Sequence, residues 1–81
     1  MKNDKVVRYR DEYIAIGLKI GYIRRQRGMT QQQLSEKADV SMGFLSQIEA
    51  PNMAMGMSLA TLFAIAEALS VPPAKLLEFD A

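Results

Sequence analysis

The sequence has 81 residues and a net charge of +1, and a chain of this length supports one hydrophobic core and therefore one domain. Hydrophobic residues make up 49% of it but aromatic residues only 7%, a mixture of aliphatic residues and Met that favours an all-α fold. Cys and His are absent, which excludes disulfides, thiolate and imidazole catalysis and the usual zinc ligands, so we expect no metal and no cofactor.

Residues 1–10 are polar and charged, and they lack a helical apolar stripe. We therefore expect a flexible basic arm in front of a single folded domain that spans residues 11–81. The arm could follow DNA phosphates or enter a minor groove, or it could be a solubilising terminus. Neither the arm nor any later segment has the apolar run of a signal peptide or a membrane span. We expect a cytoplasmic protein without membrane contact.

Charge is distributed unevenly along the chain. Residues 1–28 carry eight basic and three acidic side chains, whereas residues 29–81 carry two basic and six acidic ones. The basic part could supply the phosphate-facing surface that nucleic-acid binding requires. The alternative is an ordinary solvated mixture of charges.

Apolar residues from Tyr13 onward recur at spacings of three and four, which predicts a first helix with one buried face. This helix should end at Gly28, because glycine adopts the left-handed conformation of a helix C-terminus without a Cβ clash. The last turn is basic, as suits the helix dipole, and contains Arg24, Arg25 and Arg27.

Two short capped helices follow. Thr30 with Gln33 three residues later forms a capping box and predicts a second helix that ends near Ala38. Ser41 is a further N-cap and predicts a third helix over residues 41–49, after a very short turn. This is the helix-turn-helix arrangement, in which the second of the two helices enters the DNA major groove. With Leu45 and Ile48 turned inward, the residues left for the groove are Met42, Gly43, Ser46 and Gln47.

The last part of the chain begins with an uncharged loop over residues 51–57 that contains three Met. These Met could fold back on the core as adaptable filler or form a protein contact surface. Ser58 caps a fourth helix with a wide apolar face, and Pro73 opens a fifth. The fifth helix carries Leu76, Leu77 and Phe79.

The chain resembles the lambda-repressor-like (Cro/repressor, or XRE) helix-turn-helix family over about residues 16–79. The resemblance is carried by IRRQRGMTQQQLSEKADVSMGFLSQIE and SLATLFAIAEALSVPPAKLLEF, with Gly-apolar-Thr-Gln, Val-Ser, Leu-Ser-x-Ile-Glu and Ser-Leu-x-x-Leu in that order. It implies an all-α, five-helix fold with the helix-turn-helix at the second and third helices. It also implies a sequence-specific transcriptional regulator of double-stranded DNA, and no small-molecule effector is indicated.

The resemblance also implies roles for individual residues. Gln31 would touch a phosphate, Met42 and Gly43 would lie against base edges, and Gln47 would make paired hydrogen bonds to adenine. A solvated polar residue is the alternative for Gln47. The expected DNA-binding residues are Gln31, Gln32, Ser41, Met42, Gly43, Phe44, Ser46, Gln47 and Arg24.

In the same family an Arg near the end of the first helix pairs with the Glu that ends the recognition helix, and Arg24 and Glu49 match this structural ion pair. Three positions depart from the family pattern. Asp39 stands where the turn usually has Gly, and Gly21 stands where the first helix often has Arg. Residues 50–58 lack the Lys or Arg that usually meets a phosphate after the recognition helix.

We expect a homodimer, because one short helix reads too few bases and two copies would meet half-sites ~34 Å apart. The expected dimer interface is Leu76, Leu77 and Phe79, with burial in a monomeric core as the alternative. The alternative function is a protein-interaction module, such as an antitoxin or coactivator-like protein, that binds through the Met-rich loop. An enzyme is not expected, since no constellation of nucleophile, base and electrophile appears.

Overall fold

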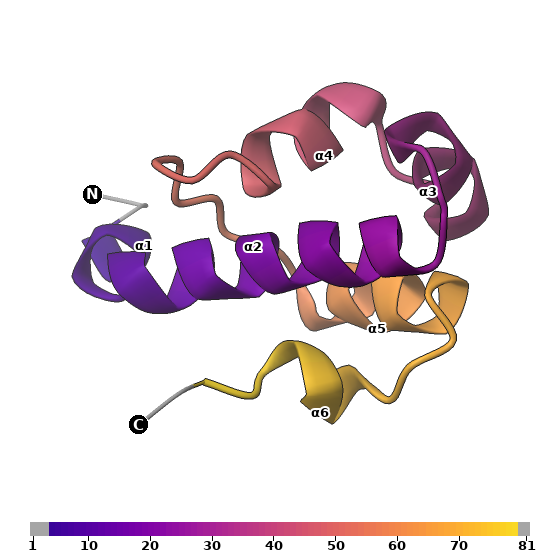
Figure 1. Cartoon of the computed structure of the whole chain (residues 1–81). Helices are drawn as coiled ribbons and strands as arrows, with labels where there is room; N and C mark the ends of the chain where they lie inside the picture. Colours follow the sequence, from indigo (N-terminus) through magenta and orange to yellow (C-terminus); the bar gives the residue numbers. More distant parts are fainter. Residues whose placement is uncertain (1–3, 80–81) are drawn as a thin grey trace.

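The computed structural model describes residues 4–79, which are helical without strands. The helices are α1 (Asp4–Arg8), α2 (Arg10–Gln26), α3 (Gln31–Ala38), α4 (Met42–Ile48), α5 (Leu59–Ala68) and α6 (Pro73–Leu76). In Figure 1, α3 and α4 lie above the long helix α2, and α5 and α6 lie below it. The all-α fold predicted from composition and spacing is confirmed, with one helix more than the five expected among the described residues.

The additional helix lies where a flexible arm was expected. Residues 4–8 form α1 and Arg10 already belongs to α2, so the described part of the arm is helical; residues 1–3 lie outside the described residues. Val6 lies against Gly56, where an added Cβ would stand 3.0 Å from its Cγ2 atom. The guanidinium of Arg10 donates to the carbonyl oxygen of Asn52 at 3.3 Å. The segment therefore packs on the loop after α4, a long-range contact that a local apolar pattern cannot reveal.

The hydrophobic core lies between α2 and the four helices that follow it. Burying a Leu or Ile side chain stabilises the fold by about 1.5–3 kcal/mol. The fully buried large side chains are Ile20, Leu34, Leu45, Ile48, Ile65, Leu69 and Leu76. Every helix from α2 to α6 contributes at least one of these side chains. Packing therefore fixes the helix-turn-helix pair to the rest of the domain.

The structure corrects the expected dimer interface at Leu76. Its side chain is fully buried in the core, whereas Leu77 is 44% exposed and Phe79 is 46% exposed. The reason is that α6 is a single turn: it directs Leu76 inward and ends there, and the residues that follow lie on the surface.

Side-chain caps start the three middle helices where the sequence predicted. Thr30 Oγ1 accepts from the backbone N–H of Gln33, and the Gln33 side chain accepts from the backbone N–H of Thr30. Ser41 Oγ accepts from the N–H of Phe44 at 3.0 Å, which starts α4. Ser58 caps α5 in the same way. Each such cap contributes about 1 kcal/mol, so these residues fix where the short helices begin.

The turn between α3 and α4 uses a left-handed residue. Asp39 has φ 57° and ψ 48°, and the N–H of Val40 returns to the carbonyl of Ser35 at 3.0 Å. This is the type of helix end that glycine usually occupies. Asp39 thus adopts the backbone conformation of the glycine that it replaces in the family pattern.

The Met-rich loop joins α4 to α5. Met55 and Met57 are partly buried and pack against the core, whereas Met53 is exposed. Two of the three side chains therefore act as the adaptable filler that the sequence offered as one of two interpretations.

Candidate nucleic-acid interface

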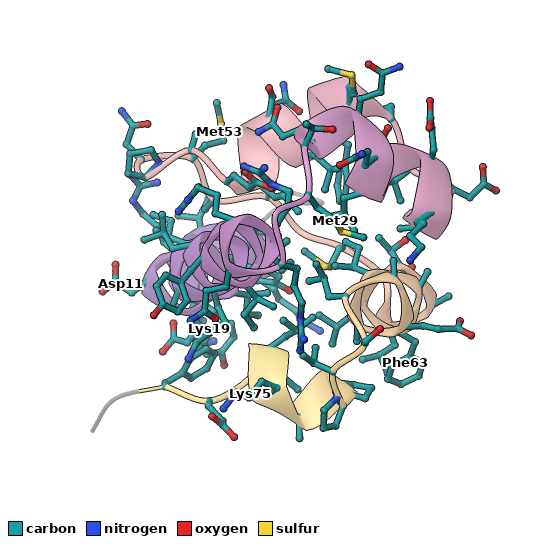
Figure 2. The ribbon with its side chains drawn as sticks, turned by 45° about the vertical axis from the view of Figure 1, so that its right-hand side comes forward. Asp11, Lys19, Met29, Met53, Phe63 and Lys75 are labelled. Atoms are coloured by element: carbon teal, nitrogen blue, oxygen red, sulfur yellow. The ribbon has the colours of Figure 1, made fainter. Side chains whose placement is uncertain are left out.

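Helix α4 presents a row of exposed residues on the outer side of the molecule. Leu45 and Ile48 are buried and fix the helix to the core. In Figure 2, α3 and α4 lie together at the top, and side chains on their outer side project away from the rest of the domain. Phe44 is half-buried. The exposed residues of the helix are Met42, Gly43, Ser46 and Gln47.

A bidentate ion pair holds the end of α4 against α2. Arg24 donates from Nε and Nη2 to the two carboxylate oxygens of Glu49, both at 2.9 Å. Its Nη1 atom donates to the carbonyl of Met29 at 2.7 Å. The side chains are 11% and 5% exposed, respectively, so the pair is largely shielded from solvent and salt. Glu49 is therefore neutralised from within the protein, and the outer face carries no free carboxylate at this point.

Gln31, at the start of α3, extends this network to the outer face. Its Nε2 atom donates to Glu49 at 3.0 Å, and its Oε1 atom accepts from the hydroxyl of Ser46 at 3.3 Å. A side-chain amide has two N–H donors, and the bond to Glu49 uses one of them. Gln31 thus connects α3 to α4 while one donor remains for a ligand on the outer side.

Gly17 is the residue of this region that sequence reasoning missed. A Cβ atom at Gly17 would overlap the backbone carbonyl of Ile48, so α2 and α4 meet there without an intervening side chain. A Cβ atom at Gly21 would stand 3.2 Å from both Cγ and Cδ of Glu49. The two glycines, four residues apart on one helix face, form a flat strip under the end of α4. The spacing of these two glycines within one predicted helix was the feature of the sequence that could have indicated a close helix contact.

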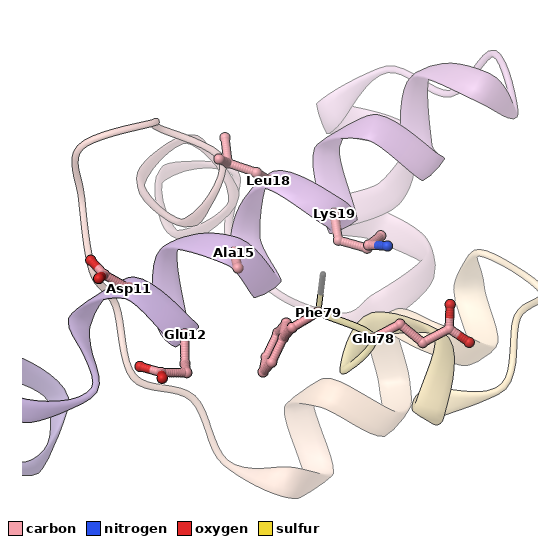
Figure 3. Close-up of a pocket in the computed structure, with 7 residues that line it drawn as sticks. All are labelled: Asp11, Glu12, Ala15, Leu18, Lys19, Glu78 and Phe79. Atoms are coloured by element: carbon pink, nitrogen blue, oxygen red, sulfur yellow. The ribbon is translucent and has the colours of Figure 1, made fainter. Parts of the chain in front are cut away.

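The opposite side of the domain carries a shallow pocket of about 490 Å³. Figure 3 shows Phe79 from the C-terminal segment beside α2, with Lys19 and Glu78 at one end. An apolar groove adjoins it and is also lined by Phe79, together with Leu59 and Leu77. Among residues 4–79 there is no group of acidic side chains arranged to hold a metal ion. The shallow pocket is bordered by charged side chains, whereas the adjoining groove on the side of α6 is mainly apolar.

The outer face and its support define a class of protein. A capped helix, a tight turn and a second capped helix with an exposed outer row are a helix-turn-helix DNA-binding unit. The chain belongs to the Cro/C1-type helix-turn-helix DNA-binding domain family, whose model matches residues 19–81. This family consists of DNA-binding domains rather than enzymes, and the helix-turn-helix prediction from the sequence is confirmed.

Two further similarities agree with this family. The chain is 41% identical over 58 residues to the immunity repressor protein of Bacillus phage phi105, a match that covers 72% of this chain and 39% of that repressor. The fold is similar to that of the restriction-modification controller protein C.AhdI from Aeromonas hydrophila, with a TM-score of 0.74. That similarity covers 82% of this chain and 97% of the controller protein at 20% identity. No helix within residues 4–79 has the length and apolar character needed to cross a membrane.

Proposed function

We propose that the chain is a transcriptional regulator that binds a specific operator in double-stranded DNA as a homodimer, with α4 in the major groove. The observation that carries this proposal is the exposed row on α4, which the Arg24–Glu49 pair holds in place from behind. The immunity repressor and the controller protein support it by their names. A cytoplasmic location, where bacterial and phage DNA lies, follows from the same proposal.

Gly43 supports close approach of α4 to another molecule. Glycine costs up to about 1 kcal/mol relative to alanine in a helix, the full cost applying in the interior, and Gly43 is in the first turn of α4. Beyond the neighbouring residues and the backbone of α4 itself, no atom of residues 4–79 lies within 4 Å of the position that a Cβ on Gly43 would occupy. The packing of the protein therefore gives no reason for glycine here, and a base edge or sugar-phosphate backbone supplies one.

The polar residues of the outer face have distinct proposed roles. Gln47 is the base reader, because its amide N–H can donate to adenine N7 while its amide oxygen accepts from adenine N6–H, in a pair that contributes roughly 1–3 kcal/mol of discrimination. Met42 offers an apolar contact to a thymine methyl. Phosphate contacts come from the first turn of α3 and the N-cap of α4, at Gln31, Gln32 and Ser41.

The dimer interface is proposed on the side of α6. Leu77 and Phe79 are exposed and line the apolar groove with Leu59 of α5. Figure 1 shows α6 on the opposite side of α2 from α4, so an interface there leaves the outer face of α4 accessible.

Selection of bound duplexes from a random pool tests the proposed function. The expected product is an inverted repeat whose half-site centres lie about one helical turn, ~34 Å, apart. Binding to the selected duplex should exceed binding to a scrambled duplex by at least about 10³ at physiological salt. An unenriched pool, with equal and strongly salt-sensitive affinities for both duplexes, would contradict the proposal.

A further inference from the structure

The length of α4 determines what lies at its ends in the proposed complex. Seven residues at 1.5 Å each make a helix of about 10 Å, and the major groove is about 12 Å wide. A helix that crosses such a groove reaches from one phosphate wall to the other. The segment that continues α4 at its C-terminus, residues 50–53, therefore lies at a phosphate wall.

This segment has no positive charge of its own. Residues 50–58 contain neither Lys nor Arg, and Pro51 has no backbone N–H to offer. The C-terminal end of α4 presents backbone carbonyls, which repel an anion. A phosphate at this wall therefore needs a cation from another part of the chain.

Arg10 lies at this position. Its Nη2 atom donates to the carbonyl oxygen of Asn52 at 3.3 Å, and its side chain is exposed. Arg24 differs, because a carboxylate neutralises its charge, whereas the partner of Arg10 is a neutral carbonyl. A guanidinium has five N–H donors in a planar fork, and the bond to Asn52 uses one of them.

We infer that Arg10 contacts a phosphate at the C-terminal wall of the groove and supplies the cation that the loop after α4 lacks. Figure 1 shows α1 and the start of α2 beside this loop, which brings residues 42 positions apart in the sequence together. The exposed basic residues Lys5 and Arg8 of α1 lie at the same end of the molecule and add positive potential there. The inference rests on the proposed function, since it places α4 in the groove.

The competing explanation is that Arg10 only ties α2 to the loop. Arg10→Gln separates the two, because a glutamine amide can still donate to a carbonyl but carries no charge. Arg10→Lys keeps the charge. Lys19→Gln is the matched control, since Lys19 is on the same helix but lies beside Glu78 on the α6 side in Figure 3.

The experiment measures the affinity of each variant for the selected duplex between about 50 and 200 mM salt, where each phosphate contact adds about 0.9 to the slope of log K against log salt. Arg10→Gln should lower the slope by about 0.9 per protomer and remove one phosphate per half-site from the ethylation-interference pattern. Arg10→Lys and Lys19→Gln should keep the slope. All variants should melt at the temperature of the parent chain.

Each outcome decides the inference. An unchanged slope and an intact interference pattern for Arg10→Gln, in a parent chain that binds its operator, would overturn the role of Arg10 and leave the proposed function standing. A parent chain that binds no duplex at any salt would overturn both. A slope lowered equally by Arg10→Gln and Lys19→Gln would show a general effect of net charge and would also overturn the phosphate contact.

Discussion

The backbone carbonyl of Ile48 lies against Gly17, so closely that the glycine has no room for a Cβ atom. Helix α2 thereby approaches the last turn of α4 without a side chain between them. Four residues further along α2, Gly21 makes room for the carboxylate of Glu49, which pairs with Arg24. The position of α4 therefore depends on glycine at residues 17 and 21 as well as on the Arg24–Glu49 ion pair.

Gly17→Ala should destabilise the domain by about 1–3 kcal/mol, because the added methyl group forces α4 away from α2. Gly43→Ala is the matched control: its Cβ meets no atom from outside α4 within 4 Å, and the gain in helix propensity should raise the free energy of unfolding by at most about 0.5–1 kcal/mol. Urea denaturation measures both. Equal effects of the two substitutions would refute the close approach at Gly17.

Removing either member of the Arg24–Glu49 pair should destabilise the protein. Arg24→Met or Glu49→Leu leaves a largely buried charge without its partner, at a cost of about 3 kcal/mol. The double variant leaves neither charge and should be less unstable than the sum of the two single variants. Denaturation of all four proteins in a double-mutant cycle gives the coupling energy. Strict additivity would mean that the pair contributes nothing to the position of α4.

Asp39 and Gly28 both have a left-handed backbone conformation, and substitutions at these two positions should change the stability in opposite directions. Asp39 has φ 57°, a conformation that costs a residue with a side chain about 1–2 kcal/mol. Asp39→Gly removes that cost but loosens the unfolded chain, so we expect a net gain of about 0.5 kcal/mol. Gly28 has φ 69° with open space around it, and Gly28→Ala should lose about 1 kcal/mol. A loss of stability in Asp39→Gly would assign the Asp39 side chain a role that its backbone does not explain.

Self-association should depend on Leu77 and Phe79. Replacing both with Ser removes the exposed apolar side chains of the proposed interface, and the dissociation constant of the dimer should rise at least tenfold, which corresponds to about 1.4 kcal/mol. Phe63→Ser is the control, because Phe63 is also exposed, at 50%, but lies on another side of the molecule. Figure 2 shows Phe63 and Lys19 on different sides, and Figure 3 shows Lys19 near Phe79. Sedimentation equilibrium measures the constant. A larger effect at Phe63 would move the interface to the outer side of α5.

The helix starts were predictable because short-range chemistry sets them. Thr30, Ser41 and Ser58 each bond to a backbone N–H three residues later, so the signal and its cause lie within one turn. The buried faces followed from spacing in the same way. The outer row of α4 was predictable as the complement of its buried positions.

The parts that sequence reasoning missed depend on contacts between distant segments. Helix α1 packs on a loop about fifty residues away, and no local apolar stripe announces it. The end of α6 after one turn decides that Leu76 is buried while Leu77 is exposed. The role of Gly17 becomes visible only when α4 is placed on α2, because the constraint is the backbone of Ile48 rather than a side chain.

Whether α4 reads the DNA is tested most directly by the binding preference of Gln47→Ala. The preference compares the selected operator with a duplex in which the adenine facing this residue is replaced. The parent chain and the control Gln26→Ala, on α2, should each prefer the operator by roughly 1–3 kcal/mol. Gln47→Ala should bind the two duplexes equally, at an affinity close to that of the parent chain for the altered one. Retention of the full preference by Gln47→Ala at every base pair of the half-site would contradict the assignment of α4 as the helix that reads the DNA.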